Sequence, residues 1–305
     1  MGQKINLNKY IAEVKSKMGI AVPDEIIEKD LILTLLLAEF EKLGIGKELI
    51  FKGGTLLSRN YLNYHRFSED LDFVYRESGE LRNVNRTARE KRIKLFIDKF
   101  TPALKKAADS LGMEFSINRS DSRFCSILHG RVVYIFRVYY SENRFIKVEI
   151  NFVEKMLYPP EEIMVRAITD FFDSRELMFT LGLNINNFRV PSYSLEEITL
   201  EKFRALLTRN EFKERDLFDL FLIRNSLMAD AGKIVDKIES SSLIKKGLEK
   251  LIAGKLLLLE KGEFFRSTEK IGDLAIIKYN PAEFERFKKE AEGKLMQICK
   301  RFLKK

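Results

Sequence analysis

The sequence predicts an α+β protein whose strands lie in the first half of the chain and whose C-terminal part is helical. Residues 113–152 are rich in Val, Ile, Phe and Tyr, which favour strands, whereas residues 194–305 have helical periodicity. The 305 residues exceed what one core usually fills. We therefore predict two domains that meet near Pro191, one over residues 1–190 and one over residues 191–305.

The first strong helix signal begins at Asp24, directly after a proline. Ile27, Leu31 and Leu35 recur at helical spacing, and Gly44 and Gly46 follow the apolar stretch. The pattern predicts a capped amphipathic helix that ends before the glycines.

A strand, a glycine turn and a helix are predicted next. ELIFK (48–52) is short and apolar enough for a buried strand, Gly53-Gly54 favours a turn, and TLLSRNYL resembles a helix start. LDFVY (71–75) is a second strand candidate.

The remaining elements follow in order. Residues 83–112 are predicted to be helical, with Pro102 as a kink or break. Three strand-rich segments come next: MEFSINRS (113–120), SILHGRVVYIFRVYY (126–140) and RFIKVEINF (144–152). An irregular stretch is predicted over 159–183, and the C-terminal helices are predicted to be interrupted at Gly254, Gly262, Gly272 and Pro281.

Composition narrows the class of protein. The formal charge of +9 and the pI near 9.3 favour polyanionic partners such as nucleic acids or nucleotides. Cys125 and Cys299 form no disulfide framework or metal knuckle, which fits a reducing compartment. The N-terminus lacks a signal-peptide pattern, and the longest apolar run (31–38) is too short to span a bilayer. We expect a cytoplasmic protein.

Two carboxylates stand one residue apart in the second strand candidate. In a strand, alternate residues share a face, so Asp70 and Asp72 point the same way while Leu71 and Phe73 point into the core. Such close like charges repel unless cations neutralise them, and Mg²⁺ is the natural partner, with Mn²⁺ as the alternative. Aspartates flanking a strand are also commonly just solvated, and that interpretation stays open for this pair taken alone.

A third carboxylate is predicted from the segment FIKVEINF. Its alternation puts Ile146, Val148, Ile150 and Phe152 inward and leaves Lys147, Glu149 and Asn151 on the polar face. If this strand neighbours LDFVY, Glu149 joins the aspartates. Three such carboxylates could hold two metals, the arrangement that clamps both oxygens of a phosphoryl displacement.

The glycine turn suggests a phosphate site. Gly53 and Gly54 let the backbone approach a phosphate, and Thr55 at a helix N-terminus adds a hydroxyl and N–H donors. Arg66 and Ser68 could contact the same triphosphate. A glycine pair between strand and helix is usually only a turn, but turn, basic residue, hydroxyl and carboxylates within 25 residues together indicate a nucleotide and metal site.

Other kinds of site lack support. His65 and His129 have no metal-ligand spacing, although His65 next to Arg66 could touch a phosphate. The sequence contains neither the GxSxG motif typical of serine hydrolases nor the GxxxxGK[ST] motif of P-loop enzymes.

At these residues the chain resembles the AbiEii/AbiGii toxin family of nucleotidyltransferases, a branch of the polymerase-β-like superfamily that includes the MenT toxins. The matching segments, in order, are EKDLILTLLL (28–37), FKGGTLLSR (51–59), RFSEDLDF (66–73) and LEKFRALLTRNEFKERDLFDLFLI (200–223). The match thins beyond about residue 225.

The resemblance implies a polymerase-β-like domain with a mixed sheet flanked by helices, followed by a C-terminal helical bundle. It implies that Gly54-Thr55 grips the β- and γ-phosphates, with Thr in place of the usual Ser, and that Asp70 and Asp72 bind metal. It also implies that Lys202 contacts the nucleotide phosphates and that Asp216 supports the site.

Read from the residues alone, the later motif has a second interpretation. Ile198, Phe203, Leu206 and Leu207 make a buried stripe, with Lys202 and Arg209 on the polar face of the same helix. Asp216 and Asp219 are adjacent on the next helix, so the residues taken without the resemblance favour an interhelical salt-bridge cluster.

The sequence thus predicts an Mg²⁺-dependent transfer of a nucleoside monophosphate from an NTP to an acceptor, with Glu149 as third ligand or general base. The resemblance and the basic surplus both suggest the 3′ end of tRNA or another RNA, which would make the protein a toxin of a toxin–antitoxin or phage-defence pair with a cognate antitoxin. The alternatives are nucleotidylation of a protein hydroxyl and a non-catalytic nucleotide-binding or interaction module.

Overall fold

The computed structural model describes residues 7–183, 188–240, 245–266, 271 and 276–304, and it divides the chain into two compact units. The first unit comprises Met1–Val153 with Pro160–Ser192, and the second comprises Glu154–Pro159 with Tyr193–Lys305. This division falls near residue 192 but places Glu154–Pro159 with the second unit, and the two domains over 1–190 and 191–305 stay a prediction.

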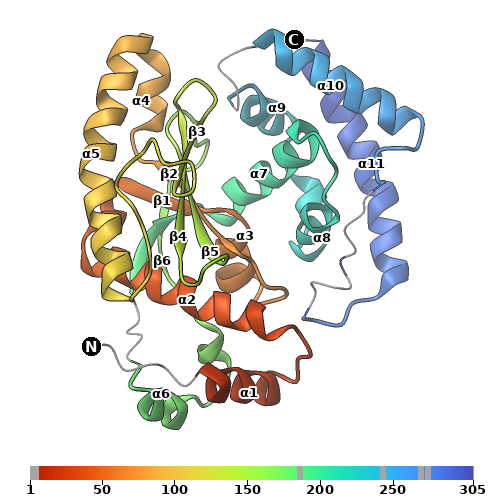
Figure 1. The fold of residues 1–305 in the computed structure, drawn as a ribbon. Coiled ribbons are helices and arrows are strands. Elements are labelled where there is room, and N and C mark those ends of the chain that lie inside the picture. Colours follow the sequence, from red (N-terminus) through yellow and green to blue (C-terminus); the bar gives the residue numbers. More distant parts are fainter. Residues whose placement is uncertain (1–6, 184–187, 241–244, 267–270, 272–275, 305) are drawn as a thin grey trace. The chain divides into compact units, whose positions relative to one another are not determined.

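The first unit is a sheet with helices, shown in Figure 1 in red to green. Its strands are β1 (Leu49–Lys52), β2 (Asp70–Tyr75), β3 (Cys125–Leu128), β4 (Val133–Tyr139), β5 (Phe145–Asn151), β6 (Glu161–Met164) and β7 (Arg189–Ser192). Its α-helices are α1 (Leu7–Met18), α2 (Asp24–Lys42), α3 (Gly53–Leu56), α4 (Ser78–Asn83), α5 (Arg86–Ser110) and α6 (Arg175–Leu181).

The seven-stranded sheet has the order β3-β4-β5-β2-β1-β7-β6. It is mixed: β2 pairs parallel with β5, and β1 pairs parallel with β7, whereas the other neighbours are antiparallel. The predicted α+β class with a mixed sheet flanked by helices is therefore confirmed.

Helices α2 and α5 cover the apolar face of this sheet. Phe73 of β2 lies 6.0 Å from Phe40 of α2, measured between ring centroids. Phe136 of β4 likewise lies 5.3 Å from Phe100 of α5. Burial of these aromatic rings is the main force that fixes both helices on the sheet, and it leaves the opposite, polar face of β2 and β5 for other side chains.

A buried ion pair joins α2 to the helical segment after the glycine pair. The Arg59 guanidinium donates to Asp30 Oδ1 at 2.6 Å and to Thr34 Oγ1 at 2.8 Å, and both charged side chains are almost completely buried. Tyr64 Oη donates to the second carboxylate oxygen of Asp30 at 3.4 Å. A buried charge is tolerated when it is paired and hydrogen-bonded in this way, so these residues set the position of Gly53–Tyr61 relative to α2.

Several predicted elements need correction. Residues 113–120 form no strand beyond one bridge, Glu114↔Tyr139, because Asn118 and Ser116 use their side chains to accept hydrogen bonds from nearby backbone N–H groups. Segment 126–140 is a hairpin, divided at residues 129–131, where all three φ angles are positive. Pro102 lies inside α5 and does not split it.

Other corrections concern residues 1–23 and the region from 159 onward. Helix α1 was not predicted, and the stretch 159–183, predicted to be irregular, contains β6 and α6. Gly254 lies within α10 and does not interrupt it. Gly262, with φ of +66°, and Pro281, at the start of α11, do mark breaks, and Gly272 lies outside the described residues.

The second unit is helical, as predicted. It contains α7 (Leu195–Thr208), α8 (Glu214–Leu222), α9 (Ala231–Ser240), α10 (Lys245–Glu260) and α11 (Pro281–Leu303). Segment Glu154–Pro159 belongs here because Lys237 of α9, fully buried, contacts Glu154 Oε1 at 2.8 Å and Glu197 Oε1 at 2.6 Å. Glu197 also accepts the N–H groups of Leu157 and Tyr158. Among the described helices, none combines the length and hydrophobicity that crossing a bilayer requires.

Candidate active site

Three carboxylates lie on the polar face of two neighbouring strands. In the parallel pairing of β2 with β5, Asp72 stands opposite Glu149 and Asp70 stands opposite Lys147. Leu71 and Phe73 are buried on the other face. The sheet thus brings Asp70, Asp72 and Glu149 together, as the alternation of both segments predicts.

Two lysines among these carboxylates were missed as site residues by sequence reasoning. Lys147 Nζ lies 2.9 Å from Asp70 Oδ2 and 3.5 Å from Glu149 Oε2. Lys52, buried at the end of β1, stands opposite Asp72 in the antiparallel pairing. The alternation of Lys147 with Glu149 was visible in the sequence, but only strand order puts Lys52 beside Asp72.

The electrostatics of this face favour an additional positive charge. The pKa of the half-buried Asp72 is raised to about 6, chiefly by burial and next by the neighbouring Glu149 carboxylate, while Lys147 and Lys52 lower it. Burial lowers the pKa of Lys147, but Asp72, Asp70 and Glu149 outweigh burial, so its pKa is above the ordinary lysine value. Lys147 therefore acts as a resident counterion.

The donor set fits a divalent cation. Carboxylate oxygens are the ligands that Mg²⁺ and Mn²⁺ prefer, and the raised pKa of Asp72 means that further positive charge nearby favours its ionised form. Within the described ranges, no group of three or more His, Cys, Asp or Glu side chains is arranged to hold a metal ion as it stands. A cation that binds all three carboxylates requires the Lys147 ammonium to move from its place beside Asp70 and Glu149.

The glycine pair begins α3 and is packed tightly against the site. A Cβ atom on Gly53, whose φ is +85°, would lie 2.4 Å from Asp72 Oδ2. A Cβ atom on Gly54 would lie 2.8 Å from a terminal nitrogen of Arg66 and 3.1 Å from Ser68 Oγ. The pair is thus the first turn of the helix and not a separate turn, and glycine is needed for close approach to the predicted site residues Asp72, Arg66 and Ser68.

We expect Gly53→Ala to reduce nucleotidyl transfer by on the order of 100-fold, because a methyl group here displaces Asp72 and a misplacement of about 1 Å can cost that much. Steady-state rates with an NTP and its acceptor measure the effect. Gly46→Ala is the matched control, because a Cβ atom there meets nothing within 4 Å. Equal rates for both variants would contradict the prediction.

The side chain of Thr55 is hydrogen-bonded within the protein. Its hydroxyl donates to the carbonyl oxygen of Asp70 at 2.5 Å, and the side chain is buried. This hydrogen bond ties the start of α3 to β2. Arg66 is also buried and donates to the carbonyl oxygen of Phe67 at 2.9 Å. The hydroxyl hydrogen of Thr55 is therefore committed to the protein backbone, whereas backbone N–H groups at a helix start are the donors that a phosphate uses.

The later motif forms a buried salt-bridge cluster in the second unit. Lys202 Nζ of α7 lies 2.8 Å from Asp216 Oδ1 and 2.6 Å from Asp219 Oδ2 of α8. Arg209 also binds Asp216. Burial raises the pKa of Asp216, but the charges of Lys202 and Arg209 outweigh burial, so its pKa lies below the ordinary value. These contacts form the interhelical salt-bridge cluster that the residues alone indicated. A catalytic role for the same residues stays a proposal.

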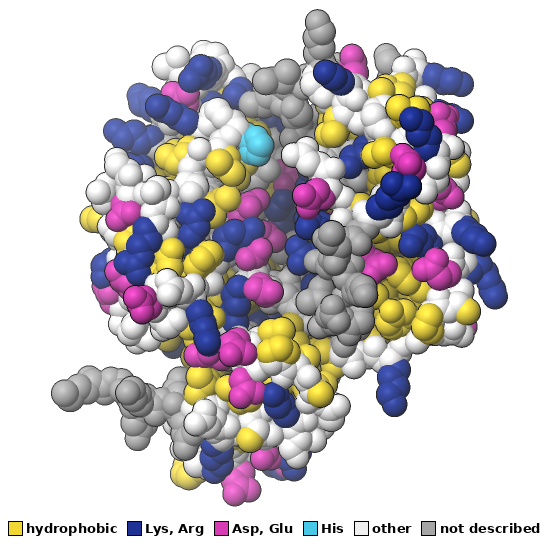
Figure 2. Space-filling model, turned by 45° about the vertical axis from the view of Figure 1, so that its right-hand side comes forward, with side chains coloured by type: hydrophobic (Ala, Val, Ile, Leu, Met, Phe, Trp, Pro, Cys, Tyr) yellow, Lys and Arg dark blue, Asp and Glu magenta, His cyan; other side chains and the backbone are white. Residues whose placement is uncertain are grey.

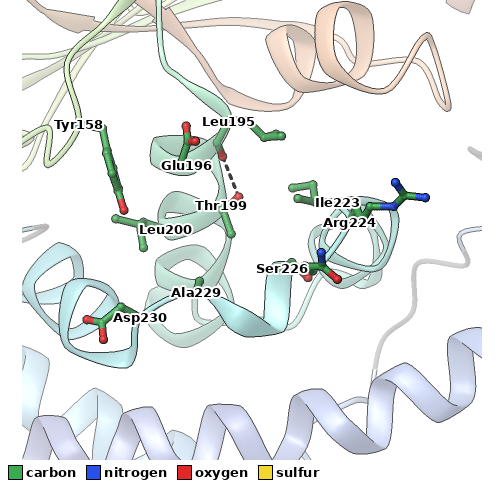
Figure 3. A pocket seen from close by; sticks show the side chains of 11 residues that line it. Tyr158, Leu195, Glu196, Thr199, Leu200, Ile223, Arg224, Ser226, Ala229 and Asp230 are labelled. Carbon is green, nitrogen blue, oxygen red and sulfur yellow. Dashed lines mark hydrogen bonds between the residues drawn. The ribbon is translucent and has the colours of Figure 1, made fainter.

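A pocket of about 220 Å³ lies within the second unit (Figure 3). Its apolar wall includes Leu195, Leu200 and Ile223, and the ring of Tyr158 stands on one side. Lys233 Nζ donates to the Tyr158 hydroxyl at 2.9 Å. None of the site residues predicted from the sequence lines this pocket.

Comparison with known proteins agrees with this fold and identifies the family of the chain. The family described as "Nucleotidyl transferase AbiEii toxin, Type IV TA system" matches residues 35–297. No curated protein matches the chain. Among solved structures, the nucleotidyltransferase toxin MenT4 (Rv2826c) of Mycobacterium tuberculosis H37Rv is similar, with 18% sequence identity and a TM-score of 0.55 over 96% of this chain and 92% of that chain.

A second solved structure is too dissimilar to support an argument. It is the STING-associated CdnE c-di-GMP synthase from Capnocytophaga granulosa, which is 13% identical over 99% of this chain and 87% of that chain, with a TM-score of 0.22.

A mixed sheet that presents paired carboxylates beside a glycine-led helix, in a chain with these matches, defines a nucleotidyltransferase. The chain belongs to the AbiEii nucleotidyltransferase toxin family, whose sequence pattern covers most of its length.

Proposed function

We propose that this enzyme transfers a nucleoside monophosphate from an NTP to the 3′ end of tRNA and releases pyrophosphate. The observation that carries the proposal is the shared polar face of Asp70, Asp72 and Glu149, next to the glycine-led start of α3. The attacking 3′ hydroxyl forms a bond to the α-phosphorus and loses its proton, while the bond between the α-phosphorus and the bridging oxygen breaks.

Asp70, Asp72 and Glu149 would hold Mg²⁺, or Mn²⁺ in its place. When bound, the metal supplies positive charge that stabilises the attacking and leaving oxygens. Glu149 either completes this ligand set or accepts the proton of the attacking hydroxyl. Asp72, with its pKa raised to about 6, ionises more readily once such charge is present.

The triphosphate would lie against the start of α3. The backbone N–H groups of Gly53, Gly54 and Thr55 would donate to its phosphates, because the first N–H groups of a helix have no intrahelical acceptor. The proposed contacts of Arg66 and Ser68 follow from their packing against Gly54.

Lys202 and Asp216 would serve the same reaction from α7 and α8. We propose that the Lys202 ammonium neutralises charge on the leaving phosphates and that Asp216 orients it, supported by their contact of 2.8 Å. Without Asp216, the Lys202 ammonium would lose its orientation, so the rate of nucleotidyl transfer should fall.

The biological role that we propose is that of a toxin acting on tRNA in a toxin–antitoxin or phage-defence pair, with a cognate antitoxin as partner. Membership of the toxin family supports the first part, and the formal charge of +9 supports an RNA acceptor.

The test is incubation with total tRNA, Mg²⁺ and each α-labelled NTP in turn, with the Asp70→Ala/Asp72→Ala double variant as control. We expect label on RNA from at least one NTP and none with the variant. Label on protein would instead identify a protein hydroxyl as acceptor, and NTP binding without any transfer would indicate a non-catalytic binding module.

A further inference from the structure

Helix α5 carries more than half of the chain's surplus of positive charge. Its residues Arg86–Ser110 include eight Lys and Arg but three Asp and Glu, a formal surplus of five, whereas the whole chain has a surplus of nine. Figure 2 shows Lys and Arg side chains, in dark blue, at the upper left of the view as well as elsewhere on the visible surface. An ordinary solvated helix face would carry a more even mixture of signs.

Four lysines of α5 are exposed: Lys91, Lys94, Lys99 and Lys106. Over the described residues, none of them lies within 4 Å of a carboxylate oxygen, whereas Arg86, Arg92 and Lys105 are paired. From Lys91 to Lys106 the helix rises about 22 Å, and these lysines span an arc of about 140°. A nucleic-acid strand places about six phosphates along such a length.

The apolar side of α5 packs against the sheet, and this packing holds the helix backbone that carries the four lysines in place. On the opposite side of the helix, Phe96 packs 5.0 Å from Tyr75, and Phe100 packs 5.3 Å from Phe136, both on the apolar face of the sheet. The carboxylates of β2 and β5 lie on the polar face, and in the strand order the β3 edge is nearer to them than the β6 edge, so it offers an RNA the shorter way to α5.

Cationic side chains mark that route. Arg137 of β4 stands opposite Lys147 of β5 in the sheet register, and it donates to the Ser122 carbonyl oxygen at 3.2 Å in the loop before β3. Arg119, in the same loop, lies 2.9 Å from Asp98 of α5. Lys147, Arg137 and Arg119 thus place cationic side chains in succession between the carboxylates and α5.

We propose that α5 is a docking surface for the sugar–phosphate backbone of the RNA acceptor, held by Lys91, Lys94, Lys99 and Lys106. The RNA reaches it over the β3 edge past Arg137 and Arg119. This inference rests on the proposed function, in which the acceptor is RNA. It requires an acceptor longer than its reacting 3′ end, because a short strand in the site does not reach the far side of the sheet.

The test compares a Lys91→Glu/Lys94→Glu/Lys99→Glu/Lys106→Glu variant with the wild-type protein. The matched control, Lys250→Glu/Lys261→Glu/Lys278→Glu/Lys289→Glu, changes four exposed lysines of the second unit and alters net charge equally. Binding of full-length tRNA without NTP should weaken on the order of 100-fold in the α5 variant, and the slope of log affinity against log salt should fall by about three. A Lys→Gln version of the α5 variant should show a smaller loss of the same kind.

Transfer assays separate docking from catalysis. We expect KM for full-length tRNA to rise in the α5 variant, whereas kcat/KM for a short single-stranded 3′-end oligonucleotide stays within about twofold of wild type. Unchanged tRNA affinity in the α5 variant, or an equal loss in the control, would overturn the docking surface while leaving the proposed function intact. If no RNA is labelled by the wild type, the proposed function fails, and the NTP-free binding measurement still decides whether α5 binds RNA.

Discussion

The Asp72→Asn variant is expected to lose at least about a thousandfold in nucleotidyl transfer, since a catalytic metal contributes several kcal/mol and each 1.36 kcal/mol is a factor of ten. Asn keeps the size and hydrogen-bonding capacity of the side chain but removes the charge that the cation requires. Single-turnover rates at saturating Mg²⁺ measure the effect. A variant that retains transfer within tenfold of wild type would show that Asp72 is not a metal ligand.

Glu69→Gln is the matched control, because Glu69 lies one residue before Asp70 but pairs with Lys29, at 2.6 Å, and not with the lysines of the site. The transfer rate of Glu69→Gln should equal that of the wild-type protein.

The folded state should not require the negative charge of Asp72. A carboxyl whose pKa is raised to about 6 binds its proton more tightly in the folded than in the unfolded chain, so its contribution to stability is present at acidic pH and is lost as pH rises through about 6. Without metal at pH 8, Asp72→Asn should therefore unfold at the same denaturant concentration as wild type or at a higher one.

The Asp30→Ala variant is expected to lose about 3–5 kcal/mol in free energy of unfolding, because it leaves the guanidinium of Arg59 buried without its carboxylate. Urea denaturation followed by circular dichroism measures the loss. The effect is specific to burial: Glu90→Ala, which breaks the exposed pair with Arg86, should leave the free energy of unfolding almost unchanged, because solvent screens such a pair.

A double variant shows whether Asp30→Ala is destabilised by the unpaired charge of Arg59 or by the cavity that the smaller side chain leaves. Asp30→Leu with Arg59→Met removes both charges and keeps apolar volume, so it should recover most of the stability that Asp30→Ala loses. If the double variant is as unstable as Asp30→Ala, the hydrogen bonds to Thr34 and Tyr64 matter more than the charge balance.

The family segments that contain these residues have two different physical uses. In FKGGTLLSR, Gly53 and Gly54 allow close approach at the site, whereas Arg59 locks the same segment onto α2 through Asp30. Asp30 itself lies in the segment EKDLILTLLL. The segment EKDLILTLLL thus holds the segment FKGGTLLSR in position through the buried ion pair of Asp30 with Arg59.

Much of the sheet was predictable from side-chain alternation. Leu71, Phe73 and the apolar residues of β5 are buried as the period of two requires, and Asp70, Asp72 and Glu149 share the other face. Short polar segments were less predictable: residues 113–120 have strand composition, but local side-chain hydrogen bonds compete with pairing there.

The sequence by itself determined the α+β class, the same-face carboxylates and the family, because periodicity and short motifs are local properties of the chain. Only the tertiary structure decided that β5 lies beside β2, that Lys147 and Lys52 neutralise the carboxylates, and that Asp30 pairs with Arg59 across 29 positions. Strand order and long-range ion pairs depend on how distant segments pack together, and the local sequence around each segment carries no record of its neighbour in space.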